Sequence, residues 1–356
     1  MQLIENELYQ EDLKTVSNIK LNWDKLRNSN FLITGATGMI GSFLIDVIMK
    51  KNKDENLNCN VFAIGRNVKK AKNRFGNYFD SNFFNFIELD INKPFILDES
   101  KFDYILHAAS NTHPKAYSTD PIGTITSNVL ATQQLLEIAK DKECKRFIFL
   151  SSVEVYGENR GDIDKFDEKY CGYIDCNTLR AGYPESKRVG ESLCQAYLNR
   201  YNLDVVIPRL SRVFGPTMLM NDTKALSQFI LKAVNNENIV LKSEGKQLYS
   251  YCYVADAVYG ILKILFDGKK GEAYNICNPE LDTTLKKLAT NISSYVGTKV
   301  VFEIPDEIER KGYSTASKAL LDITKINNIG WNPHFNIDCS IKHTISILKD
   351  LNNINI

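Results

Sequence analysis

The sequence predicts an α/β protein in which a doubly wound parallel sheet is joined to a smaller, interwoven α/β lobe. Short apolar runs alternate with helical patterns from residue 30 onward, which is typical of a parallel sheet wrapped by helices. Each run is almost continuously apolar, as in strands whose two faces are both covered. Glycines between the first run and the first helical pattern indicate the Rossmann type of this fold.

The candidate strands of the sheet lie at residues 31–35, 60–65, 85–90, 104–109, 146–152 and 204–210. The clearest helical patterns between them span residues 39–51 and 127–142. The sheet domain is therefore predicted at residues 29–212, with return segments near 245–280, and a short helical arm precedes it at residues 1–28.

Residues 213–356 are predicted to form most of the second lobe. Its expected elements are a helix at 225–235, a strand at 238–242, a strand or loop at 249–254 and a helix at 256–267. No linker rich in glycine, serine or proline separates the lobes, so we expect them to be interwoven.

The composition excludes several classes of protein. The net charge of +1 favours neither nucleic acid nor a membrane surface as a partner. The polar start of the chain is not a signal peptide, and no apolar run reaches the roughly 18 residues of a membrane span. Eight cysteines without a CxxC pair favour reduced thiols and no metal site, although Cys171 and Cys176 could approach each other. A soluble, cytoplasmic protein is expected.

Three glycines, Gly35, Gly38 and Gly41, form a GxxGxxG array between a strand and a helix. The first permits a tight turn, the second lets the backbone approach a pyrophosphate, and the third allows close packing of helix on sheet. The start of the helix has free N–H groups and a partial positive charge, which favour phosphate. This context predicts a dinucleotide cofactor, NAD or NADP.

The end of the second strand bears on the choice between these two cofactors. A carboxylate that binds the adenosine ribose often ends this strand, but here Gly65 and Arg66 take its place. An arginine there can accept a 2′-phosphate, which slightly favours NADP. The alternative is a solvated basic face, because Lys69, Lys70 and Lys72 follow on a predicted helix.

Two further strand ends complete the predicted cofactor cleft. Asp90 and Ile91 follow the third strand, where they can hold the adenine edge. Small residues at the end of the fourth strand let the cofactor pass. The predicted contacts in this part of the chain are Gly35, Thr37, Gly38, Met39, Ile40, Gly41, Arg66, Asp90, Ile91, Ala108, Ala109 and Ser110.

Tyr183 and Lys187 form a YxxxK motif on a predicted helix, where their Cβ atoms would lie about 5–6 Å apart. A lysine cation about 5 Å from a phenol contributes roughly 3 kcal/mol at an effective dielectric constant near 20. This predicts a tyrosine pKa about two below its usual value of about 10, and a nicotinamide cation would lower it further. Tyr183 could then exchange a proton with a substrate hydroxyl while hydride moves to the cofactor.

Ser152 follows the fifth apolar strand, at the carboxyl edge where open α/β sheets bind ligands. Its hydroxyl can hold the reacting oxygen of a substrate. Glu154 points the same way if the chain stays extended, and its carboxylate could act as an acid or a base. The alternative for Glu154 is a loop carboxylate in a salt bridge.

Together these residues resemble the extended short-chain dehydrogenase/reductase family, the NAD(P)-dependent nucleotide-sugar epimerases, dehydratases and decarboxylases. Within that family the chain is most similar to UDP-glucuronate decarboxylases. The resemblance covers about residues 30 to 350 and is carried by residues 107–128, 151–158, 180–197, 209–218 and 245–258.

The resemblance implies roles for individual residues. Ser152 would orient the sugar, Tyr183 would be the base, Lys187 would support it, and Glu154 would serve the central step. Tyr183, Lys187 and Asn128 would also contact the cofactor. The implied substrate contacts are Ser110, Glu154, Arg212 and Tyr249.

The resemblance also implies a reaction and an assembly. The C4 atom of a nucleotide-linked sugar would be oxidised by NAD(P)+, the ketone would permit decarboxylation, elimination or inversion, and hydride would usually return. The helices of residues 128–140 and 183–199 would pair across a two-fold axis in a homodimer.

Four positions differ from the decarboxylases. Val153 takes the place of a polar residue, so the aspartic acid of a dehydratase is absent. Arg212 replaces an asparagine, Thr217 replaces an arginine, and Tyr249 replaces the arginine that clamps the diphosphate. Arg212 is a candidate to take over phosphate binding, and the alternative is an ordinary salt bridge.

Four reaction classes follow from these features. Lyase chemistry, either decarboxylation or 4,6-dehydration, is favoured because Glu154 is present. Epimerisation comes next because Val153 and the lost arginines weaken the match to the lyases. An NADPH-dependent 4-keto-sugar reductase is suggested by Arg66. A non-catalytic NAD(P)-binding regulator is the last alternative, and the retained Ser152, Tyr183 and Lys187 argue against it.

Overall fold

The computed structural model describes residues 2–98, 101–110, 112, 117, 119–303 and 317–353. Its main sheet has the strand order β3-β2-β1-β4-β5-β7-β11, with the short β6 also paired to β7. The strands are β1 (Asn30–Thr34), β2 (Asn60–Gly65), β3 (Phe84–Glu88), β4 (Tyr104–His107), β5 (Arg146–Phe149), β6 (Ser151–Ser152), β7 (Val205–Leu210) and β11 (Ala273–Ile276). All of these pairings are parallel, which confirms the predicted doubly wound sheet.

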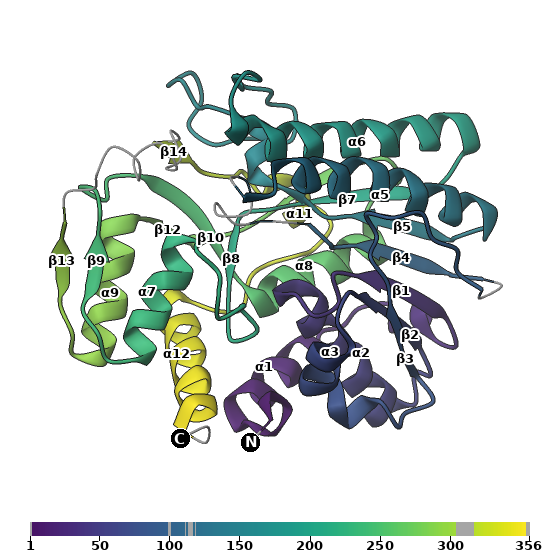
Figure 1. Cartoon of the computed structure of the whole chain (residues 1–356), viewed down its shortest axis with the longest axis horizontal. Helices are drawn as coiled ribbons and strands as arrows, with labels where there is room; N and C mark the ends of the chain where they lie inside the picture. Colours follow the sequence, from purple (N-terminus) through teal and green to yellow (C-terminus); the bar gives the residue numbers. More distant parts are fainter. Residues whose placement is uncertain are drawn as a thin grey trace.

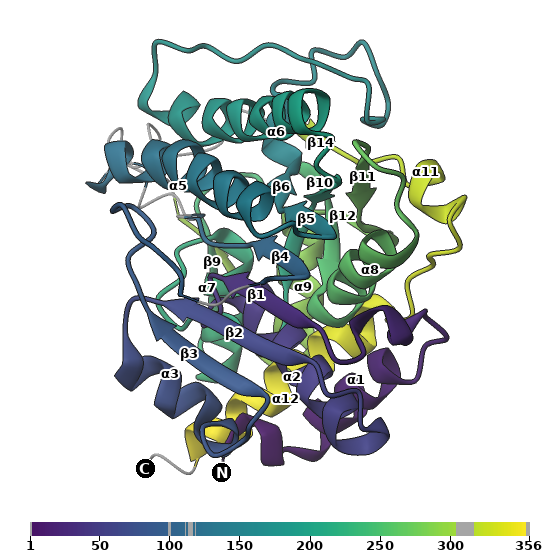
Figure 2. The same ribbon diagram turned by 90° about the vertical axis from the view of Figure 1, so that its right-hand side faces the viewer.

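Helices cover both faces of the main sheet (Figure 2). The helices α5 (Pro121–Asp141) and α6 (Gly182–Tyr201) lie side by side on one face. The helices α2 (Met39–Glu55) and α8 (Val254–Asp267) cover the other face, and α3 (Val68–Phe75) follows β2. Because strand side chains alternate, Leu32 packs in the α5–α6 core and Ile33 in the core on the α2 side.

The predicted N-terminal arm is part of the core. The helix α1 (Glu7–Ser17) packs on α2, α8 and the helix α12 (Ile337–Asn353), and Figure 1 shows α1 and α12 as neighbours. Leu13 is fully buried. The buried carboxylate of Asp12 accepts a hydrogen bond from Tyr253 and lies 2.7 Å from Nδ1 of His343. Two 3-10 turns flank the helix, at Leu3–Glu5 and Trp23–Leu26.

The second lobe lies beside the main sheet (Figure 1). One of its sheets contains β8 (Arg212–Phe214), β10 (Leu248–Tyr253), β12 (Asn278–Thr284) and β14 (Lys318–Ala319). The other pairs β9 (Ile239–Leu241) with β13 (Val300–Phe302), next to α7 (Ala225–Val234) and α9 (Leu285–Val296). The short helix α11 (Thr324–Asn327) lies near β11. The chain enters this lobe at β8 and returns to the main sheet at β11, so the two parts are interwoven.

The described part of the chain contains no helix with both the length and the apolar character needed to cross a membrane. All eight cysteines are free thiols, and Cys171 and Cys176 are both exposed. Among these same residues, no group of three or more His, Cys, Asp or Glu side chains is arranged to hold a metal ion.

Candidate active site

The glycine loop joins β1 to α2 at the carboxyl edge of the main sheet. Gly35 has a φ of 67°, and a Cβ there would lie 2.7 Å from the nitrogen of Ala109, so a side chain does not fit. A Cβ at Gly41 would lie 2.6 Å from the Gly35 oxygen. Gly38 precedes α2 without a side-chain cap, so the N–H groups of the first turn, which include Met39 and Ile40, can bind a pyrophosphate. This loop fits a dinucleotide.

The end of β4 forms the wall beside the glycine loop. Nδ1 of His107 lies 2.9 Å from Oγ1 of Thr34, and this hydroxyl accepts a hydrogen bond from the N–H group of Ala109 at 3.2 Å. Burial and the positive charge of Lys187 lower the pKa of His107 to about 3, so its imidazole is neutral at pH 7. The hydroxyl of Ser110 is buried and has no hydrogen-bond partner among the described residues, which suits contact with a ligand.

Ser152 and Tyr183 come together as the sequence predicts. Ser152 ends β6, and Tyr183 lies in the first turn of α6. The Ser152 side chain is near enough to the Tyr183 hydroxyl to lower the pKa of this tyrosine. A serine hydroxyl paired with a tyrosine hydroxyl at a strand end is suited to bind a substrate oxygen between them.

Lys187 lies one helical turn after Tyr183. Its amine donates a hydrogen bond to the carbonyl oxygen of Leu150 at 2.7 Å and lies 4.7 Å from the ring centroid of Phe149. The helix approaches β5 this closely because residue 190 is glycine, where a Cβ would lie 2.3 Å from a ring atom of Phe149. Gly190 therefore allows Lys187 to reach the edge of the sheet.

The protein groups raise the pKa of Tyr183, whereas its spacing to Lys187 predicted a lower value. Burial is the main cause, the nearby side chain of Ser152 lowers the pKa, and the charge of Glu154 raises it. Burial also lowers the pKa of Lys187 to about 7, although the charge of Glu191 opposes this. A lysine that is only partly protonated near pH 7 lowers the pKa of Tyr183 less than a full cation would. The predicted lowering of the tyrosine pKa therefore needs a further cation, such as a nicotinamide ring.

Glu154 lies between two arginines. Nη2 of Arg180 donates a hydrogen bond to its Oε2 at 3.1 Å, and Nη2 of Arg212 lies 3.8 Å from its Oε1. The chain does not stay extended after Ser152, as the sequence reading assumed, but enters a 3-10 turn at Val153–Tyr156. The charge of Glu154 still acts on Tyr183, so Glu154 is both a salt-bridge partner and an electrostatic influence on the predicted catalytic tyrosine.

Arg212 and Tyr249, at two of the four unusual positions, contact each other. The guanidinium carbon of Arg212 lies 3.5 Å from the ring centroid of Tyr249. On β10, Tyr251 is the residue opposite Arg212. Within the described residues, Nη1 of Arg212 and the hydroxyl of Tyr251 are buried without hydrogen-bond partners. A buried unpaired polar group costs about 1–3 kcal/mol, so this place suits an oxygen-rich ligand. Arg212 thus makes the expected salt bridge and keeps a donor for an anion.

The other two unusual positions have structural roles. Val153 is buried in the turn before Glu154. Thr217 donates its hydroxyl hydrogen to the backbone oxygen of Met39 at 3.0 Å. Thr217 therefore connects the second lobe directly to the glycine loop.

The sequence analysis missed Arg180 and Tyr117 as site residues. The rings of Tyr117 and Tyr183 stack with centroids 5.1 Å apart, and the guanidinium of Arg180 lies 5.8 Å from the centroid of Tyr117. Arg180 lies in a 3-10 turn at Leu179–Ala181, directly before α6, so its spacing of three residues from Tyr183 was a usable signal. Tyr117 lies in residues 107–128, which carry part of the resemblance, but no strand-end or helical spacing connects it to Tyr183.

A buried polar network lies behind Lys187. Glu191 accepts hydrogen bonds from Ser151 at 2.6 Å and from Arg209 at 2.9 and 2.6 Å. Its position one turn after Lys187 on α6 could have indicated this role. The network fixes the strand end that carries Ser152.

Asn128 connects α5 to the turn of α6 that carries Tyr183. Its Nδ2 donates a hydrogen bond to Oγ of Ser186 at 3.0 Å, and Ser186 in turn donates to the backbone oxygen of Tyr183 at 2.8 Å. Its Oδ1 is buried without a partner in the part of the chain that the structure describes. This acceptor is available to a cofactor, as the resemblance implied.

The predicted adenine contacts lie at the end of β3. Oδ1 of Asp90 accepts a hydrogen bond from the N–H group of Asn92 at 3.1 Å, and Ile91 is buried. The N–H group of Leu89 donates to the oxygen of Gly65 at 2.9 Å, so the ends of β2 and β3 adjoin. Binding of adenine by Asp90 and Ile91 stays a prediction.

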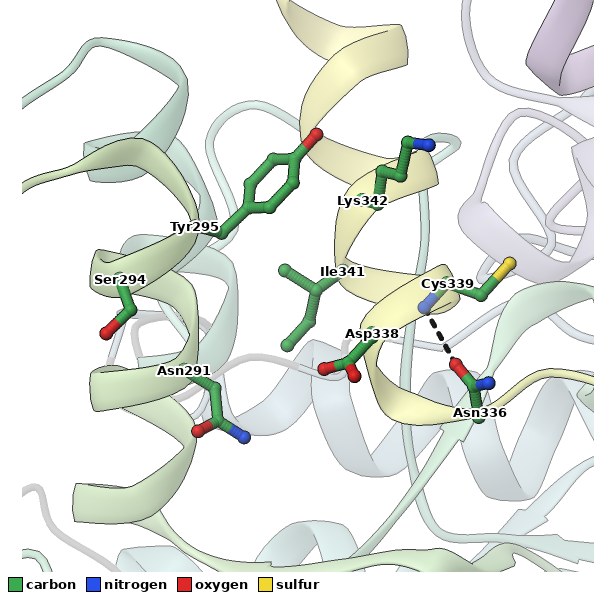
Figure 3. A pocket seen from close by; sticks show the side chains of 8 residues that line it. All are labelled: Asn291, Ser294, Tyr295, Asn336, Asp338, Cys339, Ile341 and Lys342. Carbon is green, nitrogen blue, oxygen red and sulfur yellow. Dashed lines mark hydrogen bonds between the residues drawn. The ribbon is translucent and has the colours of Figure 1, made fainter.

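A separate pocket lies between α9 and α12 (Figure 3). Figure 3 shows side chains of both helices facing it, and the N–H group of Cys339 donating to Oδ1 of Asn336 at 2.9 Å. Its lining residues are Asn291, Ser294, Tyr295, Asn336, Asp338, Cys339, Ile341 and Lys342. None of the predicted site residues lines it, so it is distinct from the site at the edge of the main sheet.

A glycine loop on a parallel sheet, with serine, tyrosine and lysine at the same edge, defines a dinucleotide-dependent enzyme of the extended short-chain dehydrogenase/reductase class. Comparison with known proteins narrows this class. Residues 31–277 match the NAD dependent epimerase/dehydratase family, and the chain belongs to this family. The resemblance seen in the sequence and the predicted class of enzyme are thereby confirmed.

Individual relatives agree with this family. The chain is 31% identical over 322 residues to UDP-glucuronic acid decarboxylase 5 of Arabidopsis thaliana, which covers 86% of this chain and 88% of the relative. The solved UDP-glucuronic acid 4-epimerase of Bacillus cereus is 24% identical with a TM-score of 0.76, covering 90% of this chain and 99% of that chain. A dTDP-glucose 4,6-dehydratase of Streptomyces venezuelae is 22% identical with a TM-score of 0.76, covering 91% and 98%. These two structures share the fold.

Proposed function

We propose that the protein modifies a nucleotide-linked sugar through a 4-keto intermediate with the help of NAD or NADP, and that the reaction is a lyase reaction. The neighbouring Ser152 and Tyr183 carry this proposal, because they lie at the carboxyl edge of the sheet and the charge of Glu154 acts on Tyr183. The substrate class rests on the printed names of relatives, a UDP-glucuronic acid decarboxylase, a UDP-glucuronic acid 4-epimerase and a dTDP-glucose 4,6-dehydratase.

Each residue of the proposed site has its own role in the reaction. The dinucleotide, held by the glycine loop and by Asn128, supplies the hydride acceptor when bound. Ser152 orients the hydroxyl of the sugar at C4, and Tyr183 takes the proton of this hydroxyl. The pKa of Lys187 is lowered to about 7, so Lys187 can take up or release the proton that Tyr183 exchanges. In dehydration, Glu154 would remove the proton from the carbon atom beside the new ketone, so that a hydroxyl group can leave as water. In decarboxylation, carbon dioxide would leave from that carbon atom and Glu154 would deliver a proton to it.

The second half of the substrate would contact the other lobe. Arg212, with its free Nη1, and the buried hydroxyl of Tyr251 offer donors to an anionic part of the substrate. Tyr249 holds the guanidinium of Arg212 by stacking. Ser110 would contact the sugar through its unpaired hydroxyl.

Epimerisation is the second candidate. One observation favours it: the residue before Glu154 is the buried Val153, which cannot protonate a leaving hydroxyl group. Epimerisation at C4 needs no acid for a departing group, because hydride returns to the other face of the ketone, whereas dehydration needs an acid for the departing water.

Mass spectrometry separates these reactions. The protein is incubated with UDP-, dTDP-, GDP- and CDP-sugars and catalytic NAD or NADP. Loss of carbon dioxide identifies decarboxylation, loss of water identifies dehydration, and an unchanged mass with a changed retention time identifies epimerisation. Tyr183→Phe should abolish the reaction, and Tyr295→Phe, an exposed tyrosine of the α9–α12 pocket, should not. Product formation that survives Tyr183→Phe would contradict the proposal.

We also propose a homodimer formed through α5 and α6. The two helices pack together on one face of the sheet, and Ile122, Leu130 and Val189 expose apolar side chains on them. Burying these side chains in a four-helix contact across a two-fold axis removes apolar surface from water. Sedimentation should give a dimer at micromolar concentration and a monomer for Leu130→Asp. A monomeric unmutated protein would overturn the assembly.

The proposed location is the cytoplasm. The eight free thiols, two of them in the exposed pair Cys171 and Cys176, support a reducing compartment, where disulfides are rare. Fractionation of the source cells with an antibody against the protein tests this location, and recovery outside the cytoplasm would contradict it.

A further inference from the structure

We propose that Cys339 is a reactive thiol that forms a mixed disulfide with a low-molecular-weight disulfide, and that His343 and Asp12 activate it. These three residues lie on α12 and α1, and none of them belongs to the site at the edge of the main sheet. The inference therefore goes beyond the proposed function.

The three side chains come from the two ends of the chain. Cys339 and His343 lie four residues apart on α12, so they share one face of the helix. Sγ of Cys339 lies 3.5 Å from Nε2 of His343, and Nδ1 of the same ring lies 2.7 Å from Oδ1 of Asp12 on α1. A nucleophile beside a base, with a third group that orients the base, is the arrangement that activates thiols and hydroxyls in enzymes.

Burial of the carboxylate fixes the orientation of the imidazole. The side chain of Asp12 is fully buried, and that of His343 is 12% exposed. Oδ2 of Asp12 accepts a hydrogen bond from Tyr253, so Oδ1 is left for the ring. Because Asp12 accepts the proton of Nδ1, Nε2 is left as the acceptor that faces the thiol.

The surroundings of Cys339 keep its thiol protonated until a base acts. Partial burial and the charge of Asp12 raise the pKa of this thiol. The charge of Lys342 lowers the same pKa, whereas the charges of Glu11 and Asp256 raise it further. A thiol with a raised pKa reacts slowly, because the thiolate is the nucleophile. The neighbouring imidazole removes this obstacle, since it can take the proton as the sulfur attacks.

Cys339 is accessible to a small molecule. It is partly exposed and lines the pocket between α9 and α12, which has a volume of about 560 Å³. Figure 3 shows its sulfur pointing away from Tyr295 of α9, so the thiol lies at the edge of this pocket. Asp338 and Lys342 also line it, and both are exposed without an ion pair within the described ranges. A pocket of this size admits a small polar disulfide.

The geometry favours disulfide exchange over acyl transfer. The N–H groups of Cys339 and Ser340 both donate to Asn336, at 2.9 and 3.1 Å. Neither group is therefore available to stabilise the oxyanion of an acyl intermediate. Disulfide exchange needs no oxyanion site, because its negative charge stays on sulfur.

The exchange balances in atoms and electrons. The thiol proton moves to Nε2 of His343 while Sγ of Cys339 attacks one sulfur of the ligand. The S–S bond of the ligand breaks, and a new S–S bond joins Cys339 to one half of it. The other half leaves as a thiolate and takes the proton from His343. The protein thiol is thereby oxidised and half of the ligand is reduced, so no further oxidant is required.

The test measures how fast each cysteine of the folded full chain reacts with hydroxyethyl disulfide, a small neutral probe, at pH 7. Mass spectrometry of peptides from the quenched protein gives the rate at each position, and the same reaction in urea gives the rate without structure. Cys171 is the internal control, because it is exposed and has no histidine partner among the described residues. His334→Gln is the matched control for His343→Gln, because it makes the same change at an exposed histidine that does not contact Cys339.

We expect Cys339 to react at least about tenfold faster than Cys171 in the folded protein, and the two to react at similar rates in urea. His343→Gln should slow Cys339 by about tenfold or more, and His334→Gln should leave its rate unchanged. Equal rates for the two cysteines in the folded, unmutated protein would overturn the inference, even if His343→Gln does not fold. A fast Cys339 in His343→Gln, or an equal loss in His334→Gln, would also overturn it. The proposed function would stand in each case, because the reaction contains neither dinucleotide nor sugar.

Discussion

Replacing Glu154 by glutamine removes one charge from the site and keeps the size and shape of the side chain. The ion pairs with Arg180 at 3.1 Å and with Arg212 at 3.8 Å are both lost. Oxidation of the sugar at C4 should continue, because Ser152 and Tyr183 are unchanged. Product formation should fall steeply, because no carboxyl group is left to remove a proton from the carbon atom beside the ketone or to return one to it.

The magnitudes separate a catalytic effect from an effect on folding. Each ion pair has a Coulomb energy of about 4–5 kcal/mol at an effective dielectric constant near 20. The side chains of Arg180, Glu154 and Arg212 are 31%, 27% and 21% exposed, so solvent screens both pairs. Their net contribution is about 1 kcal/mol or less each, against a typical stability of about 5–15 kcal/mol. General acid–base catalysis by one group raises a reaction rate by about 10²–10⁴-fold. The turnover of Glu154→Gln should therefore fall steeply while the protein stays folded.

A single-turnover experiment with stoichiometric dinucleotide distinguishes the two steps. The ultraviolet absorbance of reduced nicotinamide should rise in Glu154→Gln and remain high, because the oxidised sugar cannot proceed. It should not rise in Tyr183→Phe. Thermal unfolding of both variants checks that they are folded.

Two outcomes would refute this reasoning about Glu154. Full turnover in Glu154→Gln would show that its carboxylate has no part in the central step. If Glu154→Gln lost both the absorbance rise and the turnover, Glu154 would be assigned to the first step, beside Tyr183. The central step would then have no acid or base assigned to it.

Two further predictions concern Lys187 and Gly35. Burial lowers the pKa of Lys187 from 10.5 to about 7, so below about pH 10 the unfolded chain binds a proton that the folded protein does not. As the pH falls from 10 to 7, the unmutated protein should therefore lose about 1.4 kcal/mol of stability per pH unit relative to Lys187→Met. Urea-unfolding midpoints of the two proteins that change equally with pH would contradict this. Gly35→Ala places a Cβ 2.7 Å from the nitrogen of Ala109 and should abolish dinucleotide binding. Gly297→Ala, at a φ of 75° with no atom within 4 Å, has similar backbone strain without the contact, and calorimetry should show normal binding.

Much of the fold was predictable because strands covered on both faces are continuous apolar runs. The predicted strand at 60–65 coincides with β2, and the helix at 256–267 falls within α8. The run at 146–152 is instead divided into β5 and β6. The carbonyl oxygen of Leu150, at the division, accepts a hydrogen bond from Lys187, and no strand pattern contains information about this contact.

The site was predictable where chemistry follows a strand end or helical spacing. Ser152, Tyr183 and Lys187 are of this kind, and they lie together. The stacking of Tyr117 on Tyr183 was not predictable, because it joins segments that no local pattern connects. The direction of the Tyr183 pKa was also missed. Helical spacing gives the distance between tyrosine and lysine but not their burial, and burial is the larger effect.

The burial of α1 against α12 has a consequence for how the chain reaches its native state. Asp12 and His343 are in contact although 331 residues separate them in sequence. Contacts between such distant residues slow folding, because the entropy of closing the intervening loop is lost before the contact is gained. During synthesis, Asp12 stays without its histidine partner until residue 343 has been made. The first helix of the chain therefore completes its packing among the last events of folding.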